Sequence, residues 1–252
     1  MIFRGSLFSR ELEMETWLTV AMPDSFHDQR PHKVIYMLHG LYGNSTDWSD
    51  NTMLPLYAKE YNVVFVMPEA GHSFYADMAY GQRYFSYVSR ELPALCRNIF
   101  HISDKREDTA IMGLSMGGYG ALKCALREPE QYWLCCAFSS GGLYLKDVLD
   151  LARSGELLPE EFKAVCGVDY QYKEEDDVVE LARKVSGQAV KPVIHTTCGT
   201  EDFLYKDNIN FAKEMQGLDF TYAYDEWKGD HNWYFWDESL RRMLKKYYTP
   251  AK

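Results

Sequence analysis

The sequence predicts an α/β fold in which a mostly parallel sheet lies between two layers of helices. Short apolar runs rich in β-branched and aromatic residues alternate with longer segments that suit helices. Most runs are continuous rather than alternating, as expected for parallel strands covered on both faces. Strands that alternate with crossover helices give a three-layer sandwich. Because 252 residues is an ordinary length for one such domain, we expect a single domain over residues 1–252.

The expected elements follow from these runs. Six strands are expected, at residues 34–38, 63–67, 109–112, 133–138, 193–197 and 220–227. Helices are expected within residues 80–100, 118–127, 205–215 and 233–248. Residues 11–22 alternate, with Leu12, Met14, Thr16 and Leu18 predicted to share one face. This stretch therefore predicts an antiparallel strand at the N-terminal edge of the sheet.

Residues 141–190 interrupt the alternation of expected strands and helices. About fifty residues separate two expected strands, where a crossover needs only a dozen or more. The segment contains an acidic cluster at 173–177 and a helix-like stretch at 178–185. We interpret it as a solvated insertion or as a small cap over a site at the carboxyl edge of the sheet, and the two interpretations are compatible.

Charge and composition exclude several classes of partner. The net charge is −10 and the isoelectric point is near 5.2, whereas nucleic-acid and anionic-membrane partners require a basic surface. Glu11, Glu13 and Glu15 interrupt any secretory signal, and no apolar run reaches the roughly 18 residues of a membrane span. The six cysteines have neither C-x-x-C nor zinc-ligand spacing, and no cluster of His and Asp has ligand spacing either. We expect a cytoplasmic protein that needs no metal or cofactor.

The strongest motif is Gly113-Leu114-Ser115-Met116-Gly117, between an expected strand and an expected helix. This G-x-S-x-G pattern in a strand–turn–helix context is the nucleophile elbow of α/β-hydrolases. Small residues at both ends let the strand and the helix approach closely. Ser115 is therefore the expected nucleophile, at a helix N-terminus that favours developing negative charge.

A serine nucleophile needs a base, and two of the seven histidines follow Ser115. The order in this fold is serine, acid, histidine. His195 lies inside the expected strand 193–197, which indicates a core residue. His231 lies in a glycine-containing loop after the last expected strand, so we expect His231 to be the general base.

The acid is expected on the loop after strand 193–197, where Glu201 and Asp202 are adjacent. We favour Asp202, which would fix the tautomer of His231, and expect Glu201 to point away. Asp225, Glu226 and Asp230 are interpreted as ordinary exposed acids.

The oxyanion hole needs two backbone amides. We expect one from Met116, the residue after the nucleophile. The second is expected from Leu41, in the loop that follows strand 34–38, where Gly40 lets the backbone turn. His39 is interpreted as a structural residue that holds this loop by a hydrogen bond.

Together the motifs at 39–44, 113–122, 199–202 and 229–233 resemble those of the esterase D-like family. Within it the chain resembles bacterial tributyrin esterases and cinnamoyl or feruloyl esterases, from about residue 8 to residue 244. The resemblance implies a cofactor-free carboxylesterase for short acyl, acetyl-sugar or hydroxycinnamoyl esters, with the triad Ser115, Asp202 and His231 and oxyanion amides at Leu41 and Met116. It also implies a homodimer or homotetramer. The alternative enzyme is an S-formylglutathione hydrolase, or another thioesterase or a peptidase that uses the same triad. The alternative outside enzymes is a non-catalytic binding protein with this fold.

Aromatic residues make up 15% of the chain, and several fall on loops expected near the site. We expect Tyr42, Trp48, Tyr80 and Tyr144 to contact substrate, since an aromatic-lined pocket would suit a hydroxycinnamoyl ring. The competing interpretation is that these residues fill the core and subunit interfaces.

Overall fold

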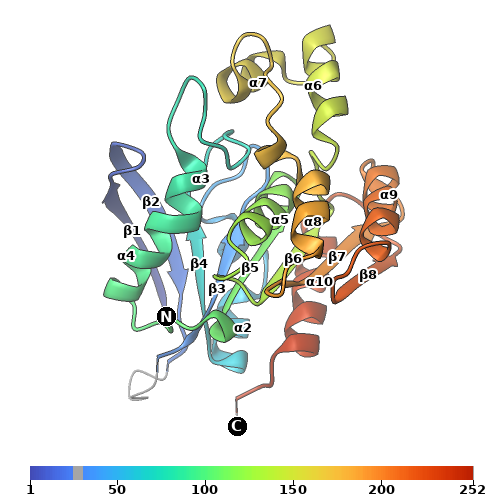
Figure 1. The fold of residues 1–252 in the computed structure, drawn as a ribbon. Helices are drawn as coiled ribbons and strands as arrows, with labels where there is room; N and C mark the ends of the chain where they lie inside the picture. The colour runs from blue at the N-terminus through green and yellow to red at the C-terminus, as the bar shows by residue number, and fades with distance from the viewer. Residues whose placement is uncertain (25–30, 252) are drawn as a thin grey trace.

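The computed structural model describes residues 1–24 and 31–251. Their strands form one sheet in the order β1-β2-β4-β3-β5-β6-β7-β8 (Figure 1). The strands are β1 (Ile2–Ser9), β2 (Met14–Ala21), β3 (Lys33–Leu38), β4 (Val63–Pro68), β5 (Thr109–Leu114), β6 (Leu134–Phe138), β7 (Val193–Gly199) and β8 (Tyr222–Trp227). In the sheet order from β4 to β8, all neighbouring strands are parallel. Strand β2 is antiparallel to both of its neighbours, β1 and β4. The predicted fold class, with its antiparallel N-terminal edge, is confirmed.

The N-terminal edge differs from the prediction in two ways. Strand β1 was not predicted, because Arg4, Gly5 and Ser6 break its apolar pattern and the strand has only β2 as a neighbour. The shared face predicted for Leu12 to Leu18 is wrong in its first half. Leu12 is buried, but in the turn before β2, and Met14 is exposed.

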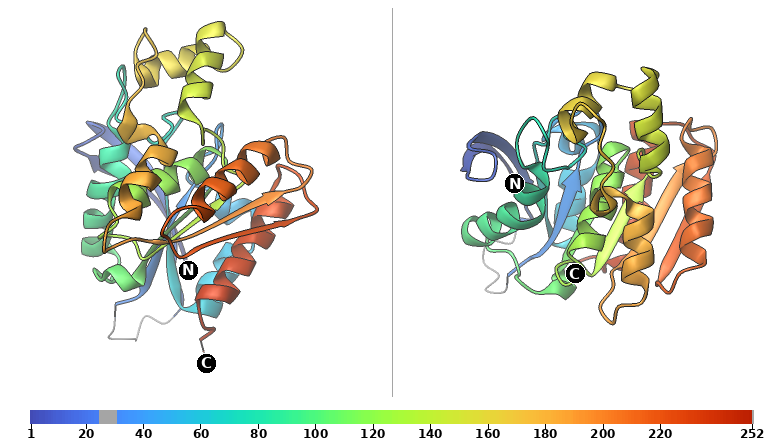
Figure 2. Two further views of the ribbon diagram at one scale, coloured as in Figure 1. Left: turned by 45° about the vertical axis from the view of Figure 1, so that its right-hand side comes forward. Right: turned by 45° about the horizontal axis from the view of Figure 1, so that its top comes forward.

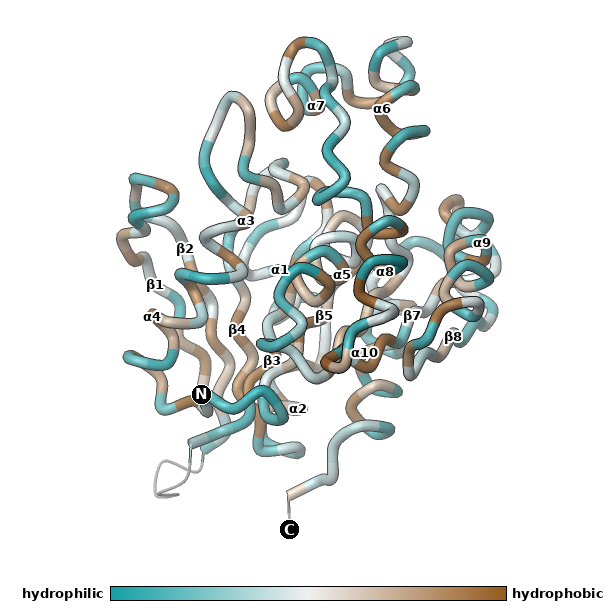
Figure 3. The backbone as a smooth tube through the Cα atoms, viewed as in Figure 1, coloured by the Kyte–Doolittle hydropathy of each residue, from teal (hydrophilic) through white to brown (hydrophobic). Residues whose placement is uncertain are grey.

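Helices cover both faces of the sheet (Figure 1). One face carries α3 (Tyr84–Ser86), the π-helical turn η1 (Tyr87–Glu91), α4 (Leu92–Ile99), α5 (Met116–Arg127), α8 (Val178–Ser186) and α9 (Tyr205–Gln216). The other carries α1 (Asp47–Asn51), α2 (Leu54–Tyr61) and α10 (Trp233–Tyr247). A short 3-10 turn, η2 (Arg106–Asp108), precedes β5. The apolar central strands therefore lie between two cores, which makes the three layers (Figure 3).

Residues 141–190 divide into two parts. Helix α8 belongs to the helical layer, as a crossover should. Helices α6 (Leu145–Ser154) and α7 (Pro159–Cys166) instead project beyond the end of the sheet at which β6 ends (Figures 1 and 2). These two helices have a separate small core that includes Leu149, Phe162 and Val165, and Ala76 joins it from the loop after β4.

A buried ion pair fastens the return from α7 to the helical layer. Lys123 of α5 is 0% exposed, and its Nζ lies 3.0 Å from Asp176 in η3 (Glu174–Asp176). The same ammonium donates to the Phe74 carbonyl and lies 5.1 Å from the Tyr119 ring. Tyr119 in turn donates its hydroxyl hydrogen to the Asp176 carbonyl at 2.6 Å. The helix that follows Ser115 is thus joined to the projecting segment.

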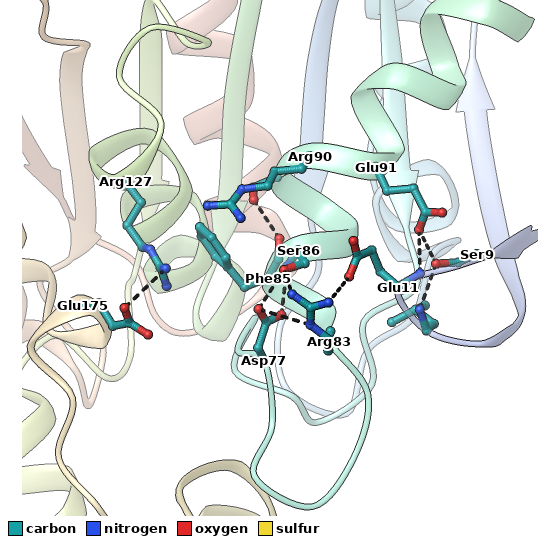
Figure 4. A network of polar contacts seen from close by, with 12 residues as sticks. Ser9, Glu11, Asp77, Arg83, Phe85, Ser86, Arg90, Glu91, Arg127 and Glu175 are labelled. Atoms are coloured by element: carbon teal, nitrogen blue, oxygen red, sulfur yellow. Dashed lines mark hydrogen bonds and ion pairs between the residues drawn. The ribbon is translucent and has the colours of Figure 1, made fainter.

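A second polar network holds the loop between β4 and α3 (Figure 4). Arg83 pairs with Glu11 of the β1–β2 turn at 2.9 Å and with Asp77 at 3.9 Å. Asp77 also accepts hydrogen bonds from the backbone and hydroxyl of Ser86. Glu91 accepts from the Ser9 hydroxyl and the turn backbone. The long loop is therefore anchored on both sides.

We expect Lys123→Met to destabilise the protein by about 3 kcal/mol, because the substitution leaves the mostly buried Asp176 carboxylate without its closest partner. Urea unfolding measures the change. As a control, Lys184→Met on the exposed face of α8 should change the free energy of unfolding by less than about 0.5 kcal/mol. Equal effects of the two substitutions would contradict the role given to the ion pair.

Candidate active site

Ser115 occupies the sharp turn between β5 and α5. Its backbone has φ +52° and ψ −119°, a conformation that non-glycine residues rarely adopt. The turn requires glycine on both sides, because a Cβ on Gly113 would collide with the Gly117 carbonyl and one on Gly117 would collide with the carbonyls of Leu38 and His39. The close approach of strand and helix is as predicted for a nucleophile elbow.

The structure brings the three predicted triad residues together. His231 Nε2 lies 3.1 Å from Ser115 Oγ, and His231 Nδ1 lies 2.9 Å from Asp202 Oδ2. Since an ionised carboxylate only accepts, Nδ1 carries the hydrogen and Nε2 is free to accept from the serine hydroxyl. The three residues come from the ends of β5 and β7 and from the loop after β8.

Asp202 is buried and kept ionised. Burial acts to raise the pKa of this carboxyl group, but hydrogen bonds from His231 and the Leu204 amide outweigh it and hold the pKa below its ordinary value. Its neighbour Glu201 is exposed and lies 3.6 Å from Lys228, so the two acids point in different directions as expected.

Two aromatic rings contact the imidazole of His231. The buried Trp236 meets it edge-on, with ring centroids 4.9 Å apart and planes at 88°. The exposed Phe203 contacts it with ring centroids 4.7 Å apart and planes at 53°. The imidazole is therefore held by packing as well as by its two hydrogen bonds.

His195 belongs to the core, as predicted. It is fully buried in β7, where Nε2 lies 2.9 Å from Asp225 and Nδ1 lies 3.0 Å from the Tyr247 hydroxyl. Burial lowers the pKa of His195, although Asp225 opposes the shift. Asp225 is exposed, as expected, but it is also the partner of this buried histidine, which was not expected.

Two peptide groups beside Ser115 have firmly held carbonyls. The Ser115 carbonyl accepts from the amides of Gly118, Tyr119 and Gly141, and the Gly40 carbonyl accepts from Gly43. The N–H of a trans peptide points opposite to its carbonyl. The N–H groups of Met116 and Leu41 therefore point away from these anchors, and no backbone carbonyl within residues 1–24 and 31–251 accepts from either one.

His39 holds the Gly40 peptide. Its Nδ1 lies 2.7 Å from the Gly40 carbonyl, and its Nε2 accepts from the Ala70 amide at 3.0 Å. Because an amide can only donate, Nε2 is unprotonated and Nδ1 donates to Gly40. The buried Tyr75 hydroxyl donates to the His39 carbonyl at 2.8 Å. The structural role predicted for His39 is confirmed.

The four aromatic residues predicted to bind substrate have different surroundings. Trp48 is 1% exposed, donates its indole N–H to the Leu38 carbonyl and packs on Phe138, a placement that favours packing over substrate contact. Tyr144 is half-buried at the start of α6. Tyr42 is exposed against His72, and Tyr80 is exposed beside the residues that follow α7.

Other residues lie nearer to the reacting atoms and were not singled out from the sequence. A Cβ added at Gly141 would lie 4.0 Å from Ser115 Oγ and 3.5 Å from Leu204 Cδ1. Phe203 and Trp236 contact His231. Phe203 and Leu204 directly follow Asp202, so the sequence alone could have indicated that they lie near the site. The positions of Gly141 and Trp236 become apparent only in the folded structure.

A family model described as "Putative esterase" matches residues 9–247. The chain belongs to this esterase family. This membership confirms the resemblance inferred from the motifs.

Individual relatives agree with the family. The esterase is 30% identical to an acetyl esterase of Caldicellulosiruptor saccharolyticus over 97% of each chain. It is 30% identical to FphF, a fluorophosphonate-binding serine hydrolase of Staphylococcus aureus, with a TM-score of 0.89 over 98% of each chain. It is 31% identical to the S-formylglutathione hydrolase FrmB of the same organism, with a TM-score of 0.85 over 98% of this chain and 99% of that one. The protein is thus a carboxylic ester hydrolase of the serine hydrolase class.

The esterase has no described helix that is both long and apolar enough to cross a bilayer.

We expect Gly117→Ala to destabilise the esterase by about 1–3 kcal/mol, because its Cβ would meet two backbone carbonyls that cannot move aside. Gly187→Ala is the matched control: Gly187 has φ −81° and open space around it. This second change should be neutral or stabilising by up to about 1 kcal/mol. Urea unfolding followed by circular dichroism compares them, and a neutral Gly117→Ala would contradict the close packing of the turn.

Proposed function

We propose that this esterase hydrolyses carboxylic esters of short acyl groups through an acyl-enzyme on Ser115, with His231 as general base and Asp202 as the residue that orients it. The observation that carries the proposal is the continuous chain of hydrogen bonds from Ser115 Oγ through His231 to the buried Asp202. A serine hydroxyl becomes a useful nucleophile only with such a base.

The proposed reaction has two halves. Ser115 Oγ forms a bond to the ester carbonyl carbon while its proton passes to His231 Nε2. The carbon–oxygen bond to the alcohol then breaks, and the alcohol leaves with that proton. Water repeats the sequence on the acyl-enzyme and releases the acid. In both halves the N–H groups of Leu41 and Met116 donate to the carbonyl oxygen as it becomes negative.

A short acyl group is the proposed acid part of the ester. A Cβ added at Gly141 would lie 4.0 Å from Ser115 Oγ and 3.5 Å from Leu204 Cδ1, so both residues are candidates to border this group. The similarity to an acetyl esterase supports this choice of acyl group.

S-formylglutathione, a thioester with the smallest acyl group, is the second candidate substrate. The likeness to FrmB supports it. Hydroxycinnamoyl esters have weaker support, because Trp48, one of the aromatic residues predicted to hold the ring, is buried in the core.

We also propose that the esterase acts in the cytoplasm as a homodimer or homotetramer, with α6 and α7 as its cap. Its six cysteines are free and buried, which suits a reducing compartment. Exposed apolar side chains on β1 and β2, including Ile2, Phe8 and Trp17, offer a surface that a second copy would cover. Light scattering of the purified protein measures the assembly.

Ser115→Ala should lower kcat about 10⁶-fold, since it removes the nucleophile. Asp202→Asn should lower kcat about 10⁴-fold, because an amide would favour the wrong tautomer of His231. Glu201→Gln, one residue away and exposed, is the control and should keep nearly full activity. Initial rates with p-nitrophenyl acetate measure all three. Full activity in folded Ser115→Ala would overturn the proposed function.

Substrate choice is tested with p-nitrophenyl acetate, butyrate and octanoate, ethyl ferulate, chlorogenate and S-formylglutathione. We expect kcat/KM for acetate or butyrate to exceed that for octanoate at least about tenfold, because each methylene that cannot be accommodated costs about 1–3 kcal/mol. The highest kcat/KM on ferulate or chlorogenate would instead make the protein a hydroxycinnamoyl esterase, and the highest on S-formylglutathione would make it a thioesterase.

A further inference from the structure

Phe203 is an exposed aromatic side chain that touches the imidazole of His231. The residue is 77% exposed, yet its ring centroid lies only 4.7 Å from that of His231. The proposed reaction needs Ser115, His231 and Asp202 but gives Phe203 no part. An exposed aromatic ring in contact with the general base is therefore available for another role.

The turn that carries Phe203 is fixed on both sides. The Asp202 amide donates to the Gly199 carbonyl at 3.1 Å, and the Leu204 amide donates to the Asp202 carboxylate at 2.8 Å. The Tyr205 amide then donates to the Asp202 carbonyl at 2.9 Å, where α9 begins. Phe203 is thus held at the tip of an anchored turn.

The chemistry defines what would pass beside this ring. A departing alcohol takes its proton from His231 Nε2, so its oxygen must come within about 3 Å of that atom. The buried Trp236 already covers one side of the imidazole. Phe203 contacts the same imidazole and is itself largely exposed, so an alcohol that extends from Nε2 toward solvent can meet its ring.

We propose that Phe203 is a specificity-determining residue for the alcohol part of the ester, and that it favours aromatic alcohols over small ones. An aromatic alcohol can pack against the Phe203 ring as it takes the proton, whereas an ethyl group offers little surface for contact. This inference rests on the proposed function. It concerns the alcohol that leaves, and not the acyl group that is joined to Ser115.

The competing role for Phe203 is orientation of His231, and the two halves of the reaction separate the roles. Hydrogen bonds to Ser115 and Asp202, with the packing of Trp236, already hold the imidazole. A contact with the alcohol acts only while the acyl-enzyme forms. Orientation of the base acts in both halves, since His231 also activates the water that releases the acid.

The experiment compares Phe203→Ala and Phe203→Leu with wild type on phenyl acetate and ethyl acetate, which share the acetyl group. In Phe203→Ala we expect kcat/KM for phenyl acetate to fall about tenfold and that for ethyl acetate to change less than about twofold. Phe203→Leu should recover part of the loss. Because each substrate is compared with itself, intrinsic reactivity cancels. Leu56→Ala, which removes an exposed apolar side chain from α2, is the control and should change neither substrate.

The hydrolysis rate of the acetyl-enzyme, measured after a burst with p-nitrophenyl acetate, should be the same in Phe203→Ala and wild type. Equal losses on both acetates, or slower acetyl-enzyme hydrolysis, would make Phe203 an orienting residue and overturn the inference. Unchanged kinetics would overturn it as well. Acetate hydrolysis by folded Ser115→Ala would instead overturn the proposed function, so the two failures are distinguishable.

Discussion

The close approach of β5 and α5 at Ser115 is the constraint on which the rest of the site depends. The strained backbone of Ser115 costs about 1–3 kcal/mol and persists only where surrounding structure fixes it. That structure is the sheet itself, because β5 lies between β3 and β6 with a helical layer on each face. The cost is therefore offset by the packing of the whole sheet, and the nucleophile stays half-buried at a rigid position.

The two candidate oxyanion donors are also held at fixed positions. Each is a peptide N–H whose own carbonyl is hydrogen-bonded into the protein, by α5 and Gly141 in one case and by His39 and Gly43 in the other. Dipoles held in this way need no reorientation when charge develops, which is why fixed peptide groups stabilise an oxyanion better than water does. The buried Tyr75 extends the support behind His39.

Sequence reasoning recovered the sheet, its antiparallel edge and the residues that meet at Ser115, because each leaves a local signal. Buried parallel strands are continuous apolar runs, and the elbow requires glycines at fixed positions. It failed where the position of an element depends on contacts between residues that are far apart in the sequence. Strand β1 has a mixed pattern because it is an edge, and Trp48 looked like a loop residue although its helix turns it into the core. The division of residues 141–190 into a layer helix and a projecting pair also depends on contacts with distant Ala76 and Lys123.

The separate core of α6 and α7 has a consequence for how such a protein can change over generations. These helices bury their apolar side chains mainly against one another, and the chain enters them after Gly141 and returns through the Asp176 ion pair. A segment with its own packing and two defined junctions can be lengthened, shortened or exchanged without disturbing the layers that position Ser115. The fold thus separates the elements that carry Ser115, Asp202 and His231 from a helical pair whose length and sequence can diverge on their own.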